Sequence, residues 1–535
     1  MKLPSSVLFG CLLLGPALNA AEPATVHVFH HENVLGTSLE LKAVTASPAE
    51  AERAEAAALA EIDRLAGILS TYDSASEASR WLRTTQSPVK VSPELFEVLG
   101  LFDQWRTRTA GALDAAAETI SRLWQTAAAQ GQPPAPAAIA EAVATVRQRH
   151  WSLDATARTA THLTAAPLVF NSFAKSYIAS HACDAALQAA NLKAMVVNIG
   201  GDLIVRGDLT ETVGLADPRA DAENDPPLAA LRVRDLAVAT SGDYRRGVAI
   251  GGRWYSHLVD PRTGQPAGEI ISATVVAPAA TDAGALATAC CVLDPAKGLQ
   301  AVAARPGAEC LLITRDGRRL ASAGWHALES APAAASGDIR GLLATRQPAV
   351  LIDTAPAAPP TAAAPKTESA APPAAPAGLW DENNELMVSL ELMRFDGRRA
   401  ARPFVAVWVE DADKYPVRTL ALWFNGGRWL PDLRTWQHEE QLRALTEGTA
   451  LTKSASSATR APGKYTLKWD GKDNSGKLVK AGKYTVLIET AREHGTYQLI
   501  RQEMDFNGTP AKLELKANPE VSAASLDYHR KANGP

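Results

Sequence analysis

The residues of this sequence that are best suited to chemistry are concentrated between positions 171 and 288. Glycines, hydroxyl side chains and a few charged groups gather there in short polar segments that core packing does not require. Backbone N–H groups at glycine turns, hydroxyls and Lys or Arg side chains are together what a phosphorylated ligand needs. The segments are residues 171–175, 198–202, 239–245 and 257–264.

Each segment taken alone also has an ordinary explanation. The Gly200-Gly201 pair can simply turn the chain at the end of a strand, and Asp260-Pro261-Arg262-Thr263-Gly264 is good turn chemistry in its own right. The set as a whole, and not any single member, indicates a site for a phosphorylated ligand.

Seven short motifs occur in order between Leu35-Gly36-Thr37 and Asp316-Gly317. Together they resemble the ApbE family of FAD:protein FMN transferases. The motifs are Ser70-Thr71-Tyr72-Asp73, Ser76-Glu77-Ala78-Ser79-Arg80, Gly111-Ala112-Leu113-Asp114, Ala174-Lys175, Gly200-Gly201-Asp202, Thr240-Ser241-Gly242-Asp243-Tyr244 and His257 to Gly264.

The resemblance implies a flavin cleft, FAD as donor and a divalent metal, usually Mg²⁺, beside the pyrophosphate. The hydroxyl of a Thr or Ser on an exported flavoprotein attacks the FMN-side phosphorus, and AMP leaves. Tyr72 is expected to pack on the isoalloxazine, and Lys175 is expected to be catalytic by neutralising phosphate charge. The other expected cofactor-binding residues are Glu77, Asn171, Ser172, Gly200, Gly201, Asp202, Thr240, Ser241, Gly242 and Asp260.

His257 is expected to be catalytic, since the resemblance places its motif close to the reacting phosphates. A histidine with a pKa near neutrality can position or deprotonate the acceptor hydroxyl. The alternative is that His257 only hydrogen-bonds the turn at Asp260.

The sequence departs from the family pattern at several positions that concern the site. Asn171-Ser172 replaces a Gly-Gly pair, and Ser176 replaces the glycine that follows the lysine. The family also has Asp-x-x-x-Thr before an apolar helix, with carboxylate and hydroxyl about one turn apart on one face. Here the threonine is Thr288, but Gly284 stands at the acidic position.

Asp282 is the carboxylate nearest to Gly284 in sequence, so we expect Asp282 and Thr288 as the metal ligands. Six residues apart, they can face one ion only if Asp282 sits at or before the N-cap of the helix. The alternative is that Asp282 only caps that helix.

Two other functions stay open at this point. An FAD pyrophosphatase on the same scaffold would use water in place of the protein hydroxyl and release FMN and AMP. A non-catalytic FAD-binding assembly protein would bind the flavin without turning it over.

The elements that must position these residues fall into two folded parts. Residues 331–378 are rich in Ala and Pro, a composition typical of an extended spacer that cannot bury a core. Before the spacer, the spacing of apolar residues predicts helices at 49–70 and 93–108 and strands at 194–199 and 271–276.

After the spacer, strand-like segments dominate, at 386–394, 404–409, 419–424, 464–469 and 484–490, and they favour a β-sandwich. The Trp residues of this part are expected in its core. The fold class is therefore α+β, with a flavin transferase domain at 21–330, a linker at 331–378, a β-rich domain of unknown role at 379–520 and a tail at 521–535.

The first twenty residues indicate an export signal, because Lys2 precedes an apolar run and Ala20 offers a small-residue cleavage site. We therefore expect a periplasmic or otherwise exported protein without a transmembrane span in the mature chain. A lipid anchor at Cys11 is not expected, because the apolar run continues beyond it. The net charge of −4 gives no basic field, so we expect no nucleic-acid partner. The other four cysteines lie in apolar contexts and are expected to be buried thiols.

Overall fold

The computed structural model describes residues 23–243, 247–330, 378–393, 402–424, 427–447, 456–457, 459–492 and 496–531. The expected export signal, with Cys11 and the cleavage site at Ala20, lies outside these residues, as does nearly all of the Ala/Pro-rich linker. Across the described ranges, no helix combines the length and the apolarity needed to cross a bilayer.

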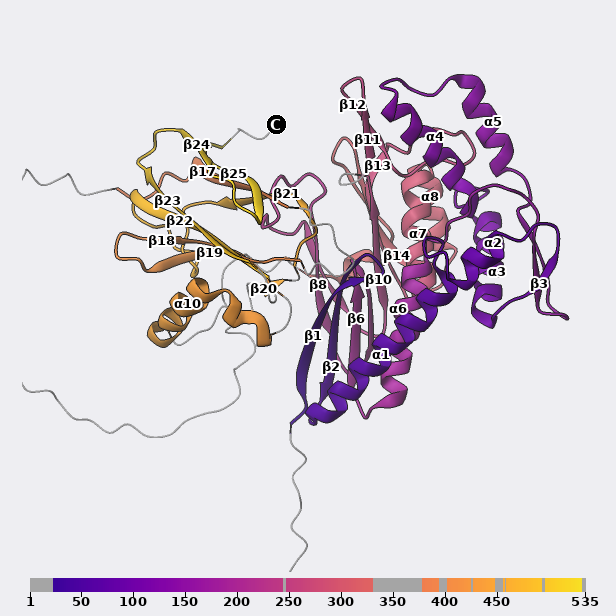
Figure 1. Ribbon diagram of the computed structural model, residues 1–535, viewed down its shortest axis with the longest axis horizontal. Coiled ribbons are helices and arrows are strands. Elements are labelled where there is room, and N and C mark those ends of the chain that lie inside the picture. Colours follow the sequence, from indigo (N-terminus) through magenta and orange to yellow (C-terminus); the bar gives the residue numbers. More distant parts are fainter. Residues whose placement is uncertain are drawn as a thin grey trace, which may run out of the picture.

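The first unit is built on an eight-stranded antiparallel sheet in the order β1-β2-β6-β7-β10-β13-β14-β15 (Figure 1). Strand β13 is buried at every position, which fits a strand covered on both faces. The β6–β7 hairpin turns through Gly200 and Gly201, both at positive φ, where glycine has no steric penalty. The strands are β1 (Thr25–Val34), β2 (Thr37–Thr45), β6 (Ala194–Ile199), β7 (Asp202–Gly207), β10 (Ala237–Gly242), β13 (Ile270–Ala277), β14 (Glu309–Thr314) and β15 (Arg319–Ala321).

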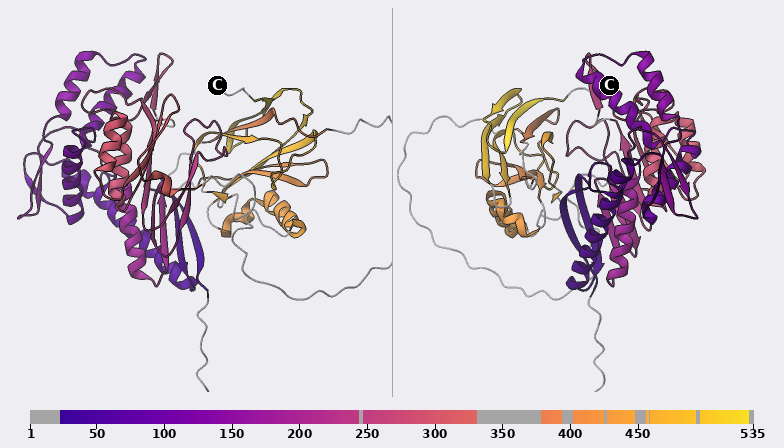
Figure 2. Two further views of the ribbon diagram at one scale, coloured as in Figure 1. Left: turned by 180° about the vertical axis from the view of Figure 1, so that it is seen from behind. Right: turned by 45° about the vertical axis from the view of Figure 1, so that its right-hand side comes forward.

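Four helices cover one face of this sheet (Figures 1 and 2). The longest, α1, is capped by Ser47, whose Oγ accepts the amide of Glu50 and so satisfies one N–H of the first turn. Its buried residues recur at three- and four-residue spacing and pack on α6 and β2. The helices are α1 (Pro48–Leu69), α6 (Ala174–Ala189), α7 (Ala280–Val292) and α8 (Pro295–Ala303).

The opposite face of the sheet is covered by a second layer of strands. Apolar side chains of this layer form a separate core against the sheet, and Trp325 is fully buried within it. The layer consists of β8 (Glu211–Leu215), β9 (Ala229–Val233) and β16 (Glu329–Ser330), with the short helix α9 (Trp325–Leu328).

A mainly helical lobe extends from the helix-covered face and shares its core. It contains a small three-stranded sheet and a separate two-stranded hairpin. Its elements are α2 (Glu77–Leu82), β3 (Pro88–Lys90), α3 (Pro93–Arg108), η1 (Ala115–Ala117), α4 (Glu118–Ala129), α5 (Pro136–Val146), β4 (Trp151–Asp154), β5 (Thr159–His162), β11 (Gly247–Ile250) and β12 (Arg253–Ser256).

The second unit is a β-sandwich with sheet orders β21-β17-β25-β24 and β20-β19-β18-β22-β23. Its inner core includes the contacting rings of Trp380, Trp469 and Phe506. A second core, with Trp408 and Trp436, lies beneath α10 on the outer face of the five-stranded sheet. The elements are β17 (Asn384–Leu392), β18 (Phe404–Glu410), β19 (Pro416–Trp423), η3 (Gly427–Asp432), α10 (Arg434–Glu447), β20 (Ser456–Ser457), β21 (Gly463–Trp469), β22 (Gly482–Ala491), β23 (Tyr497–Phe506), β24 (Ala511–Leu515) and β25 (Val521–Arg530).

The predicted α+β fold class, the helices at 49–70 and 93–108 and the β-sandwich are confirmed, as are the four buried cysteines. The expected tail at 521–535 is wrong, because residues 521–530 form β25, which pairs with both β17 and β24. The second unit therefore extends to residue 530, because β25 lies between β17 and β24 in its four-stranded sheet.

The two units also contact each other away from the linker. Loop 217–227 of the first unit lies along the edge strand β21, where the amide of Glu223 donates to the carbonyl of Thr466 at 2.8 Å. The side chain of Asn224 exchanges two hydrogen bonds of 2.8 and 2.7 Å with the backbone of Lys468. The Lys468 ammonium lies 3.1 Å from the Asp225 carboxylate. This contact is polar and includes one backbone–backbone hydrogen bond to the edge of the sheet.

Candidate active site

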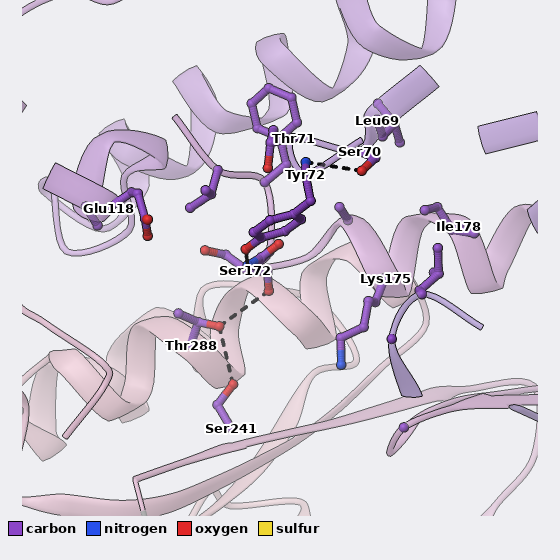
Figure 3. Close-up of a pocket in the computed structure, with 18 of the residues that line it drawn as sticks. Leu69, Ser70, Thr71, Tyr72, Glu118, Ser172, Lys175, Ile178, Ser241 and Thr288 are labelled. Carbon is purple, nitrogen blue, oxygen red and sulfur yellow. Dashed lines mark hydrogen bonds between the residues drawn. The ribbon is translucent and has the colours of Figure 1, made fainter. Parts of the chain in front are cut away.

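A cavity of about 1460 Å³ opens where α1, α6 and α7 meet the ends of the sheet strands (Figure 3). Small-molecule sites usually measure roughly 300–1,000 Å³, so this one has room for a dinucleotide. Segments from many parts of the first unit line it. Ten residues predicted from the sequence are among them, namely Tyr72, Asn171, Ser172, Lys175, Gly200, Thr240, Ser241, Gly242, His257 and Thr288.

Tyr72 presents its ring to this cavity from the turn after α1. The side chain is 73% exposed, which is unusual for a large aromatic group without a partner to cover it. Ser70 Oγ accepts the amides of Tyr72 and Asp73 and so holds the turn. Asn171 Nδ2 donates to the phenol oxygen at 2.5 Å. The ring is therefore positioned by its neighbours and still open to a ligand.

Lys175 lies in the first turn of α6 and lines the cavity, as Figure 3 shows. Next to it, Ser176 donates a hydrogen bond of 2.8 Å to Asp202 Oδ2 on β7. Burial raises the pKa of the Asp202 carboxyl, and the charge of Lys175 and the bond from Ser176 counteract the rise. Asp202 therefore acts on the site through Lys175 and Ser176, and it is not part of the cavity wall.

Gly200 allows the chain to close one side of the cavity tightly. A Cβ at this position would lie 2.5 Å from Thr37 Oγ1, far inside van der Waals contact, and the residue also has φ of +58°. Both Gly200 and Thr37 line the cavity. Glycine is thus required here by close approach as well as by conformation.

Three hydroxyl and carbonyl groups meet on the α7 side of the cavity. Thr288 Oγ1 lies 3.3 Å from Ser241 Oγ and donates to the carbonyl of Ser172 at 3.4 Å (Figure 3). Ser241 is on β10, where its neighbour Thr240 bonds Thr274 of β13 at 2.9 Å. Strand β10, helix α7 and the turn before α6 together form this polar wall.

His257 follows β12 and lines the cavity beside Leu258 and Val259. It also lies near Asp243, which is buried and forms an ion pair with Arg315. Burial raises the pKa of the Asp243 carboxyl, and the charges of Arg315 and His257 counteract the rise. His257 therefore lines the cavity and also interacts electrostatically with the buried carboxyl of Asp243.

Several predicted residues are not on the cavity wall. Asp260 accepts the amide and guanidinium of Arg262 at 2.8–2.9 Å, so it builds its own turn. Glu77 accepts the amide of Ser92 at 2.6 Å and joins α2 to α3 beside a separate hollow of about 270 Å³. Gly201 forms the β6–β7 turn next to Gly200 without lining the cavity.

The structure does not bring Asp282 to Thr288. Helix α7 already includes Asp282, since its N-cap is Ala279. The Asp282 carboxylate pairs with the guanidinium of Arg305, at 2.9 Å from Nε. Six helical residues place the two side chains on different faces, and Asp282 is absent from the cavity wall. The expectation of a joint metal site is corrected on this ground.

One polar side of the cavity was not predicted from the sequence. Glu118, Ser121 and Gln125 of α4 all line it. Their spacing of three and four residues puts them on one helical face, and this periodicity was the available signal. In the described part of the chain, no group of three His, Cys, Asp or Glu side chains is arranged to hold a metal ion.

Comparisons with known proteins agree with the division of the chain into two units. Residues 35–312, just over half of the chain, match the ApbE family, and residues 385–523 match a family described as "Predicted periplasmic protein (DUF2271)". The FAD:protein FMN transferase of Treponema pallidum is 28% identical over 338 residues, which cover 59% of this chain and 92% of that protein. That of Haemophilus influenzae is 27% identical, over 59% of this chain and 94% of its own. The crystal structure of the ApbE protein of Thermotoga maritima aligns with 57% of this chain and 100% of its own, with a TM-score of 0.51 and 25% identity.

Proposed function

We propose, because this chain belongs to the ApbE family, that it is a flavin transferase that moves FMN from FAD to a Thr or Ser hydroxyl of an exported flavoprotein. The observation that carries the proposal is the single cavity that joins the exposed ring of Tyr72 to Lys175, His257 and the hydroxyl wall at Thr288. A flat aromatic surface and a cationic, hydrogen-bonding wall are what the two ends of FMN require.

In the proposed reaction, the acceptor hydroxyl oxygen forms a bond to the FMN-side phosphorus of FAD. The anhydride bond from that phosphorus to the AMP oxygen breaks, and AMP leaves with the electron pair. The hydroxyl proton passes to His257 or to solvent. The charge that builds up on the phosphoryl oxygens needs fixed positive groups, and Lys175 supplies one.

The resemblance also implies Mg²⁺ at the Thr288 wall. The residues there offer the Thr288 hydroxyl and the Ser172 carbonyl, but position 284 is a glycine, and Asp282 is engaged with Arg305. The expected pair of carboxylate and hydroxyl is therefore incomplete, and the residues at this wall do not fit the metal. Magnesium dependence of this protein is a separate quantity to be measured.

We also propose that the transfer takes place outside the cytoplasm. The second unit supports this, since its family is described as periplasmic. The unit would then accompany the transferase to the compartment where its acceptor flavoprotein resides.

The decisive experiment is incubation of the full chain with FAD, with and without a flavoprotein that carries a modifiable Thr. Covalent FMN on that protein, detected by mass spectrometry, is the expected result. Free FMN and AMP without acceptor labelling would instead identify a pyrophosphatase. Unchanged FAD that is nevertheless bound would identify a non-catalytic flavin protein. The same assay titrated with Mg²⁺ measures the metal dependence.

A further inference from the structure

Two positions that depart from the ApbE pattern touch each other in this structure. Ser176 is in the first turn of α6, and Gly284 lies on α7, which packs against α6. Both residues are buried. They are far apart in the sequence, and only the fold shows that they share one small space beside the candidate site.

With Ser176 in place, there is no room for a side chain at position 284. A Cβ built on Gly284 would collide with Ser176 Oγ and would also lie 3.3 Å from the Cα of Phe173. The second neighbour is backbone, which cannot turn aside as a flexible side chain can. The contact with Phe173 is tight, but the collision itself is with the hydroxyl of Ser176.

Ser176 is itself held in this position. Its hydroxyl donates to Asp202 Oδ2 at 2.8 Å, and the side chain is 2% exposed. Turning the hydroxyl away from Gly284 would break its bond to a carboxylate that burial already disfavours as an ion. The serine therefore resists the movement that a larger residue at 284 would require.

We propose that Ser176 and Gly284 are a matched pair in which the α6 hydroxyl excludes an acidic side chain from α7, so that the wall beside Thr288 binds free divalent cations weakly. A carboxylate at 284 would lie one helical turn before Thr288 and on the same face, where it could share an ion with that hydroxyl. This inference rests on the proposed function for its significance, but it concerns a property of the resting protein.

The steric part is tested by the thermal stability of Gly284→Ala, Ser176→Gly and the double variant. Helix propensity favours Ala over Gly, so a gain in stability is the ordinary outcome. We expect instead that Gly284→Ala lowers the Tm by about 5 °C, as overpacking does, and that adding Ser176→Gly restores most of the loss. Gly100→Ala on α3 is the matched control, since its nearest neighbour would be 3.8 Å away. An unchanged or higher Tm for Gly284→Ala would overturn the matched pair.

The metal part is tested by calorimetric titration of Mn²⁺ without FAD. We expect Ser176→Gly/Gly284→Asp to bind Mn²⁺ at least tenfold more tightly than the native chain. Two results would each overturn the proposal: an affinity of the double variant for Mn²⁺ no higher than that of the native chain, or tight binding by Gly284→Asp alone at an unchanged Tm.

Failure of this inference can be told apart from failure of the proposed function. If the variants give the expected Tm and Mn²⁺ results but the native chain leaves FAD unchanged, the transferase proposal is refuted and the matched pair stands. If the native chain transfers FMN covalently and also binds Mn²⁺ tightly, the matched pair is refuted and the transferase proposal stands.

Discussion

The first unit leaves polar and aromatic side chains open toward one cavity, whereas the second unit buries comparable groups and pairs them internally. Tyr72 of the first unit is 73% exposed, but Trp408 and Trp436 of the second are at most 2% exposed. Trp408 Nε1 donates to Glu410 at 2.8 Å. Buried Glu489 accepts the amides of Thr435 and Trp436 at 2.8 and 2.7 Å, which caps the start of α10.

This difference shows why residue type alone does not reveal a site. Both units carry carboxylates and aromatic rings in apolar surroundings. In the second unit, the partners of these groups belong to the same fold, so their role is to satisfy buried polar atoms. In the first unit, the hydroxyls of Ser241 and Thr288 and the ammonium of Lys175 belong to residues that line a cavity, which a ligand can fill. Variants in the two units should therefore affect different quantities.

The largest effect is expected for His257→Ala in the first unit. If His257 accepts or orients the acceptor proton, kcat for FMN transfer should fall by about 10²-fold or more, while FAD affinity changes little. Steady-state kinetics and FAD titration measure the two quantities. His326→Ala is the control, since His326 is 83% exposed and belongs to the short helix α9. Equal losses of kcat and FAD affinity would indicate a structural histidine.

Glu489→Ala should have the converse effect. The change leaves two amides of the first turn of α10 without an acceptor inside the fold, which should cost about 2–4 kcal/mol of unfolding free energy. The turnover of FAD should stay the same, because the residue is in the other unit. Chemical denaturation measures the loss. Glu503→Ala is the control, as this residue is exposed and pairs with exposed Lys483, and such a pair contributes at most ~1 kcal/mol. A similar loss for both variants would contradict the assigned role of Glu489.

A smaller effect is expected for Tyr72. Tyr72→Ala should weaken FAD binding about tenfold, since a stacked ring contributes roughly 1–3 kcal/mol. Tyr72→Phe keeps the ring and loses only the bond from Asn171, so its FAD affinity should be close to the native value. Fluorescence titration with FAD compares the two. If Tyr72→Phe binds as weakly as Tyr72→Ala, the hydroxyl and not the ring contacts the flavin.

Much of the site could be predicted from the sequence because its residues occur in short motifs. Such motifs, however, do not distinguish cavity-facing groups from their supports. Asp260 and Glu77 belong to the motifs, yet their carboxylates are used by Arg262 and by the amide of Ser92. The contact between Ser176 and Gly284 depends on the packing of α6 on α7 and has no local signal.

The fold followed the sequence most closely where apolar periodicity was strong. Helix α3 has the predicted bounds, and β6 matches residues 194–199. Strand β25 was missed although Ala524, Leu526 and Tyr528 alternate as buried positions. Small residues dilute this pattern, since Ser and Ala have little strand preference.

The smallest effect is expected from separating the two units. A chain ending at Ser330 should fold and keep its flavin chemistry, because the apolar cores of the first unit are drawn from residues before that point. What it loses is the polar contact of loop 217–227 with β21. The bonds to Asn224 and Glu223 contribute about 1 kcal/mol each, so the Tm of the first unit should change by no more than about 5 °C, and kcat should stay within about twofold.

In the full chain, Asn224→Ala should make loop 217–227 more sensitive to limited proteolysis, whereas Asn507→Ala, a surface change in the second unit, should not. Aggregation of the shortened chain under conditions that keep the full chain soluble would show that the units depend on each other, and the contrast between a ligand-binding unit and a self-contained sandwich would then fail.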